Sequence, residues 1–177
     1  MSRATLRRGR RLRQRDRAEI EDVLLRYCRG IDRCDADLLR SAYHDDAHDD
    51  HGVFAGSPDA FVAWALQGLL AKEQITTHLL TNVLIEPESR RRARCESYFI
   101  GTHVADENDQ THIAEFHGRY VDVLERRAGI WAIAARRTIY DWTEKRRIAR
   151  VHAAGDPRFD HGRRSRSDPV YADDATS

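Results

Sequence analysis

The sequence predicts an α+β domain in which N-terminal helices pack on one face of a curved antiparallel sheet. Before Gln74, apolar residues recur at helical spacing, and after it they alternate with a period of two over four long segments. A chain of 177 residues with 41% hydrophobic residues is enough for one domain with a substantial core. We expect a basic disordered extension at residues 1–15, the folded domain at 16–145 and an irregular polar tail at 146–177, which could lie on a neighbouring surface.

Three helices are expected in the first half of the chain. The segment Asp16-Arg17-Ala18-Glu19 has the form of a capping box, and apolar residues then follow at spacings of three and four as far as Ile31. A second, short helix fits Asp35 to Tyr43. The third begins at Ser57-Pro58-Asp59, which supplies an N-cap, a proline at the first helical position and an acid in the first turn. We expect a small strand at residues 51–54.

Four long strands are expected in the second half. Between them lie turn-forming segments rich in Pro, Asn, Asp, Ser and Gly, which break the alternation. The predicted strands are Ile75–Ile85, Ala93–Val104, Thr111–Leu124 and Ile130–Trp142. The residues Tyr98, Ile100, Ile113, Val121 and Val123 would form either the core or a second apolar face. An exposed apolar face of that size favours a homo-oligomer, a dimer or a trimer.

Composition excludes several classes of function. The 30 Lys and Arg residues nearly balance 29 Asp and Glu residues, which removes the simplest argument for binding nucleic acid or an anionic membrane. No apolar run approaches the roughly 18 residues that a membrane span needs. Three cysteines without CxxC spacing suit a reducing cytoplasm. The strong excess of arginine over lysine indicates a GC-rich bacterial genome, and the arginine-rich start reads as a solvated arm; a nucleic-acid arm is the alternative.

A run of three histidines and four aspartates spans residues 44–51. It could be a metal cluster, but neighbouring ligands diverge on any regular element and the usual spaced motif is absent. The alternative is a structural exit from the second helix into the sheet. We expect no metal there. His103, His112 and His117 are expected on the sheet surface or in an interface.

Several short motifs occur in an order that is informative as a set. They are the helix pattern from Ile20 to Asp32, Asp45-Asp46-Ala47, Thr77-His78 with Thr81-Asn82, Gly118-Arg119-Tyr120, and Trp131 followed five residues later by Arg136. Over residues 16–145 this set resembles the SnoaL-like branch of the nuclear transport factor 2-like superfamily. The resemblance implies a cone-shaped α+β barrel, and it implies kinship with cofactor-free dehydrochlorinases and dehydratases.

The resemblance also implies a catalytic set. His78 would be a base, Asp32 its carboxylate partner, and Tyr27 and Arg136 polar stabilisers. An imidazole can abstract a proton at neutral pH when a carboxylate fixes its tautomer and stabilises its cation. Each residue also has a structural interpretation: a core histidine, a core tyrosine with its hydroxyl bonded, and an arginine in an ion pair with Asp32 or Glu115. Tyr27 and Asp32 could reach one site only if Gly30 loosened the last helical turn.

The expected function is a cofactor-independent lyase or isomerase acting on an apolar cyclic, steroid- or polyketide-like molecule. Candidates for the apolar lining are Phe54, Trp64, Phe99 and Phe116. The family's second aspartate is missing from residues 95–99, and Asp49 stands where a pocket tryptophan is expected, so the resemblance does not give the substrate. The alternative is a non-catalytic binding or assembly subunit of the same fold, like the small subunit of ring-hydroxylating dioxygenases. A His78–Asp32 contact facing an apolar pocket would favour the enzyme.

Overall fold

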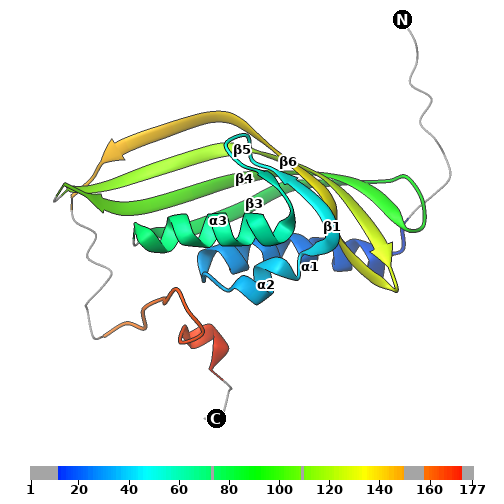
Figure 1. Cartoon of the computed structure of the whole chain (residues 1–177), viewed down its shortest axis with the longest axis horizontal. Helices are drawn as coiled ribbons and strands as arrows, with labels where there is room; N and C mark the ends of the chain where they lie inside the picture. Colours follow the sequence, from blue (N-terminus) through cyan, green and yellow to red (C-terminus); the bar gives the residue numbers. More distant parts are fainter. Residues whose placement is uncertain (1–11, 73, 109, 150–157, 173–177) are drawn as a thin grey trace, which may run out of the picture.

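Within the described residues, three α-helices lie against one face of a six-stranded sheet (Figure 1). The computed structural model describes residues 12–72, 74–108, 110–149 and 158–172. The elements in chain order are α1 (Gln14–Asp32), α2 (Ala36–Arg40), β1 (Tyr43–Asp50), β2 (Ala55–Gly56), α3 (Pro58–Ala71), β3 (Ile75–Pro87), β4 (Arg92–Glu107), β5 (Gln110–Arg127), β6 (Ile130–Arg147) and the short 3₁₀ turn η1 (Pro169–Tyr171). The predicted α+β class is confirmed.

The sheet is mixed and open, whereas the sequence predicted an antiparallel one. Its strand order is β2-β1-β6-β5-β4-β3, and β1 runs parallel to β6 while the other pairs are antiparallel. A parallel pair needs a long crossover between its strands, and here α3 and the β3–β5 meander provide it. Because β1 and β3 lie near opposite edges of the sheet, residues from both edges can line one concave space beneath it.

The segment between the second and third helices differs from the prediction. The second helix ends at Arg40 rather than Tyr43, and β1 occupies residues 43–50, while 51–54 form a turn and not a strand. Tyr43, Ala47 and Asp49 are buried in β1. A buried aspartate amid exposed aspartates and histidines gives no apolar alternation, which is the signal on which strand prediction depends.

The first helix begins two residues before the expected start. Asp16 is its third residue, and its carboxylate accepts hydrogen bonds from the Arg13 backbone N–H at 3.3 Å and from Trp131 Nε1 at 3.2 Å. Leu12 packs against the core, and Gln14 and Arg15 form the exposed start of α1, so the helix begins within the segment that we expected to be an extension. The rest of that expected extension, residues 1–11, lies outside the described residues.

The four predicted strands are present, and all are longer than predicted.

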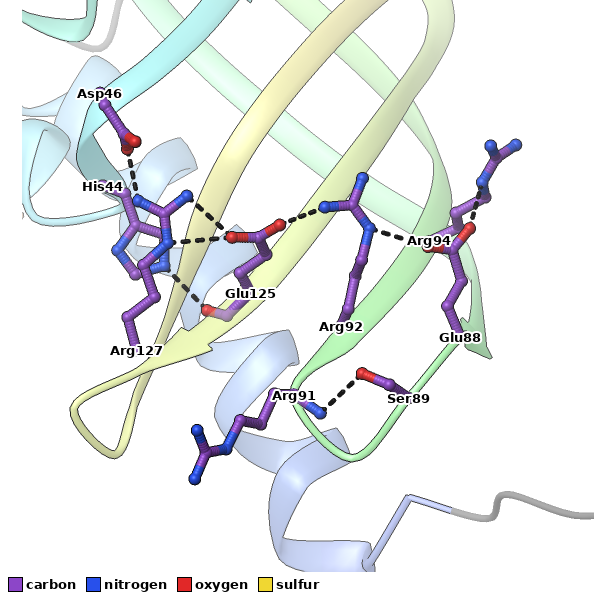
Figure 2. A network of polar contacts seen from close by, with 9 residues as sticks. All are labelled: His44, Asp46, Glu88, Ser89, Arg91, Arg92, Arg94, Glu125 and Arg127. Atoms are coloured by element: carbon purple, nitrogen blue, oxygen red, sulfur yellow. Dashed lines mark hydrogen bonds and ion pairs between the residues drawn. The ribbon is translucent and has the colours of Figure 1, made fainter.

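A network of ion pairs covers the surface at one end of the sheet (Figure 2). Arg127 pairs with Asp46 and Glu125. Arg92 pairs with Glu125 and Glu88. A ring nitrogen of His44 lies 2.8 Å from the Glu125 carbonyl oxygen. The first half of the His/Asp run thus serves the surface, and no cluster of three metal-ligating residues occurs in the part of the chain that the structure describes.

The described part of the polar tail after β6, residues 158–172, packs on the domain. Tyr171 donates its hydroxyl proton to Asp35 at 2.7 Å, and Arg166 lies 3.2 Å from the same carboxylate. Asp168 pairs with Arg33 at 3.3 Å. Residues 158–172 therefore cover the turn between α1 and α2. None of the helices among the described residues is both long and apolar enough to cross a membrane.

The crossing of α1 and α2 depends on a glycine. A Cβ added at Gly30 would lie 2.6 Å from the Leu39 backbone, whereas one at Gly68 in α3 would have nothing within 4 Å. We expect Gly30→Ala to lower the free energy of unfolding by about 1–3 kcal/mol, because overpacking forces backbone shifts. Gly68→Ala is the matched control, and it should be neutral or stabilising because alanine is the better helix former. Equal melting temperatures for the two variants would contradict this packing.

Candidate active site

A histidine and an aspartate meet where the end of α1 reaches β3. Asp32 Oδ1 lies 2.7 Å from His78 Nδ1, and Asp32 Oδ2 accepts the His78 backbone N–H at 2.9 Å. Thr76 donates its hydroxyl proton to Asp32 Oδ1 at 2.9 Å. A carboxylate only accepts hydrogen bonds, so Nδ1 of His78 is the donor of this pair, and Nε2 has no hydrogen-bond partner among the residues that the structure describes. The two side chains are 9% and 13% exposed, which keeps competing water low.

The dyad opens on a cavity of about 500 Å³ under the concave face of the sheet. That volume lies within the range of small-molecule sites. Polar groups enter a largely apolar and aromatic wall, as such sites require. The lining includes Tyr27, Ile31, His51, Phe61, Trp64, Leu69, Lys72, Gln74, His78, Phe99, Gly101, His103, Phe116, Tyr120 and Tyr140.

Three of the four predicted lining aromatics reach the cavity. Trp64, Phe99 and Phe116 line it. Phe54 stacks on the ring of Trp64 with centroids 5.1 Å apart and so supports the wall. Another hollow, of about 510 Å³, lies beside α1 against Ile130 and Trp131, but its lining among the described residues contains no histidine, and its charged side chains are Glu19, Asp22, Arg26 and Arg29.

Tyr27 lines the cavity, although not by the route expected. The helix stays regular to Asp32, and Gly30 packs against α2 instead of loosening the last turn. The Tyr27 hydroxyl lies 3.0 Å from Nε2 of His51. Burial raises the pKa of Tyr27 well above its usual range, against the opposing effect of the Arg136 charge. The hydroxyl therefore keeps its proton at neutral pH.

Arg136 is buried behind the cavity wall. Its Nε and Nη2 donate to the two oxygens of Asp122 at 2.8 and 2.7 Å, so its ion-pair partner is Asp122 and neither Asp32 nor Glu115. The guanidinium carbon lies 4.0 Å from the ring centroid of Tyr27 and 4.1 Å from that of Tyr120. Burial alone would lower the pKa of Arg136, but the Asp122 charge outweighs it and raises that pKa. The arginine thus fixes two cavity tyrosines through cation–π contacts.

His103, which we expected on the sheet surface or in an interface, lines the cavity. Its ring centroid lies 6.0 Å from that of His78, and its Nδ1 lies 2.9 Å from Gln74 Oε1. Burial, and then the nearby His78, lower the pKa of His103 to about 4, so this ring is neutral at neutral pH. His103 lies an even number of residues after Cys95, Ser97 and Phe99, which are buried in β4, so its side chain is on the same face of the sheet; strand parity was the signal available in the sequence.

A second imidazole–carboxylate pair was also missed. His51 and Asp49 are in direct contact, and both are buried. They come from the second half of the His/Asp run at residues 44–51, whose first half belongs to the surface network of ion pairs. No sequence motif marks them, because the pair follows a strand that the residue pattern did not reveal.

The comparisons with known proteins agree with this fold. The model of the SnoaL-like domain matches residues 13–137. A type 2 hexachlorocyclohexane dehydrochlorinase superposes with a TM-score of 0.67 at 21% identity, covering 81% of this chain and 95% of that one. A scytalone dehydratase-like protein from Novosphingobium aromaticivorans superposes with a TM-score of 0.66 at 20% identity, covering 80% and 94%.

A protein of different role has the same fold. It is described as the β subunit of an aromatic-ring-hydroxylating dioxygenase from Novosphingobium aromaticivorans, with a TM-score of 0.58, 20% identity and coverage of 73% and 91%. No curated protein sequence matches the chain. Similarities at this level of identity show the fold alone, whereas the domain model spans most of the chain. The chain belongs to the SnoaL-like domain family.

Proposed function

We propose that this protein is a cofactor-independent lyase or isomerase that abstracts a proton from an apolar cyclic, steroid- or polyketide-like molecule. The observation that carries the proposal is the Asp32–His78 dyad at the wall of an apolar cavity. A scaffold subunit needs no such cavity, and a structural histidine needs no buried carboxylate at Nδ1. Family membership and the dehydrochlorinase- and dehydratase-type neighbours support the same reaction class.

The dyad supplies the base. His78 Nε2 takes the proton from a carbon next to a carbonyl group, and the electron pair of the broken C–H bond moves into the substrate. The electrons then either expel a leaving group from the next carbon or return to take up a proton at another position. Asp32 stabilises the imidazolium that forms, and its second oxygen, bonded to the His78 backbone, holds the strand in register with the helix end. Positioned acid–base catalysis of this type contributes about 10²–10⁴-fold.

In this proposal Tyr27 contacts the substrate, whereas Arg136 acts on it only through the tyrosines. Tyr27 presents its hydroxyl to the cavity and stabilises the substrate oxygen. Arg136, held by Asp122, is a positioning residue that keeps the rings of Tyr27 and Tyr120 in place. Trp64, Phe99 and Phe116 supply the apolar contact area that binds the ring system.

The outer face of the sheet favours self-association. Tyr98 and Leu79 are 41% and 54% exposed there, and Trp142 stacks on His117 with centroids 3.6 Å apart. Their strand partners place these side chains on the face opposite the helices. The β-subunit neighbour shows that this fold also serves in an assembly, which keeps the non-catalytic alternative open.

We therefore expect a homo-oligomer, a dimer or a trimer, in which this face is covered. Light scattering at micromolar concentration should give a multiple of the 20.4 kDa chain mass. Tyr98→Arg should shift the mass toward the monomer, because it replaces a half-exposed aromatic ring with a second positive charge beside its strand partner Arg119. A wild-type mass equal to one chain would contradict the expectation.

The base is tested by hydrogen exchange on 1-tetralone, an apolar bicyclic ketone with exchangeable protons at C2. Wild-type protein in D₂O should accelerate deuterium incorporation, followed by NMR, and His78→Ala should remove most of that acceleration, about 10²-fold or more. Asp32→Asn should also lose rate, and the double variant should lose little more, because the pair acts as one unit. Tetralone affinity should change much less than rate.

Melting curves of the same variants are the control for folding. A folded His78→Ala protein with full exchange activity would end the mechanism as drawn. A wild-type protein that binds tetralone without accelerating exchange would favour the non-catalytic alternative.

A further inference from the structure

The cavity holds a second imidazole–carboxylate pair that the base mechanism does not use. His51 Nδ1 contacts Asp49 Oδ1, and Tyr43 donates its hydroxyl proton to Asp49 Oδ2 at 2.6 Å. The Asp49 carboxylate is fully buried, and His51 is 8% exposed. Among the described residues, these are the hydrogen-bond partners of the buried Asp49 carboxylate, which accepts only, so the histidine tautomer is fixed: Nδ1 carries a proton, and Nε2 is left for another partner.

That other partner is the Tyr27 hydroxyl, 3.0 Å away. Tyr27 and His51 both line the cavity, so the chain Asp49–His51–Tyr27 runs from the core to the substrate space. The ring of Phe61 stacks on His51 with centroids 4.7 Å apart and holds the imidazole plane in place. When His51 is neutral, Tyr27 donates to Nε2 and offers the cavity an acceptor. When His51 is protonated, Nε2 donates to Tyr27, and the tyrosine offers the cavity a proton.

The two histidines reach the cavity from opposite parts of the sheet. His51 directly follows β1, whereas His78 lies on β3, with β6, β5 and β4 between those strands in the sheet order. A molecule bound in the cavity therefore has the base on one side and the Tyr27 hydroxyl on another. The other charged group close to Tyr27 is Arg136, and Asp122 already pairs with it.

To act as a general acid, Tyr27 needs a second group that replaces the proton it gives away. The high pKa of its buried hydroxyl opposes a free tyrosinate beside the cavity. A proton that leaves Tyr27 must be replaced in the same step, and the Nε2–H of a protonated His51 is placed to do so. Asp49 stabilises that imidazolium, as Asp32 does for His78.

We propose that Asp49, His51 and Tyr27 form a proton relay that protonates an oxygen leaving group, so that the substrates of this site are β-hydroxy carbonyl compounds. The assignment rests on the proposed function and makes the reaction a dehydration. His78 Nε2 takes the proton from the carbon next to the carbonyl, and the C–H electrons form the C=C bond. The C–O electrons leave with the oxygen, which receives the Tyr27 proton and departs as water. His51 Nε2–H reprotonates Tyr27, and exchange with solvent restores both histidines.

The test compares two leaving groups on one ring system. Loss of water from 3-hydroxy-1-tetralone gives 1-naphthol, which is followed by fluorescence, while 3-acetoxy-1-tetralone gives the same product by releasing acetate, which needs no proton. In Tyr27→Phe, and in the double variant Asp49→Asn/His51→Gln, the hydroxy substrate should lose about 10²-fold in rate. The acetoxy substrate, and C2 exchange of 1-tetralone, should lose only a few-fold.

Tyr171→Phe is the matched control, because it removes a hydroxyl bonded to the buried Asp35 outside the cavity, and it should change neither rate. Tyr27→Phe leaves the Asp49–His51 pair in place and so guards against misfolding of the double variant. Equal losses for both leaving groups, or no loss, would overturn the relay. Wild-type exchange at C2 without dehydration would overturn the relay alone, whereas absence of wild-type exchange would overturn the proposed function and the relay with it.

Discussion

The carboxylate of Asp32 is the constraint on which the site depends. It sits at the last residue of α1, where the helix dipole disfavours negative charge. Three hydrogen bonds offset that cost: one from the His78 backbone, one from its imidazole and one from Thr76. The same bonds tie the end of a helix to the edge strand β3. The interaction that positions the base therefore also fixes one end of the cavity.

The other end of the cavity is built from buried polar groups on the central strands. Arg136 and Asp122 form a fully buried bidentate pair. The guanidinium also makes cation–π contacts with the rings of Tyr27 and Tyr120. Asp49 lies in β1, which pairs with β6 at Arg136. Buried charges of this kind are costly unless they are well paired, and they add less stability than apolar side chains of the same volume would. Their geometric result is a set of fixed hydroxyl and imidazole groups in an otherwise apolar cavity.

The sequence predicted most of the fold because the helices and the β3–β6 meander follow periodicity and caps. It missed β1 because Asp49 is buried among exposed acids, and it missed the parallel pairing with β6 because long-range pairing leaves no local pattern. The pairing of His78 with Asp32 followed from the family resemblance, not from spacing. His51 was assigned to a short strand, since its role depends on a turn that only the three-dimensional structure shows. Arg136 was identified by position, but its partner Asp122 lies across a strand pair whose register could not be derived.

The central claim is that one bound molecule faces both imidazole systems, and a crystal structure with 2-naphthol tests it most directly. This ligand has the ring system of 3-hydroxy-1-tetralone and an oxygen at the position of its leaving hydroxyl group, but it cannot eliminate water. The account predicts naphthol in the cavity with its oxygen hydrogen-bonded to the Tyr27 hydroxyl and the adjacent ring carbon in contact with His78 Nε2, about 3–3.5 Å away. Naphthol bound in the hollow beside α1, or in the cavity with its oxygen turned away from Tyr27 and His78, would contradict it.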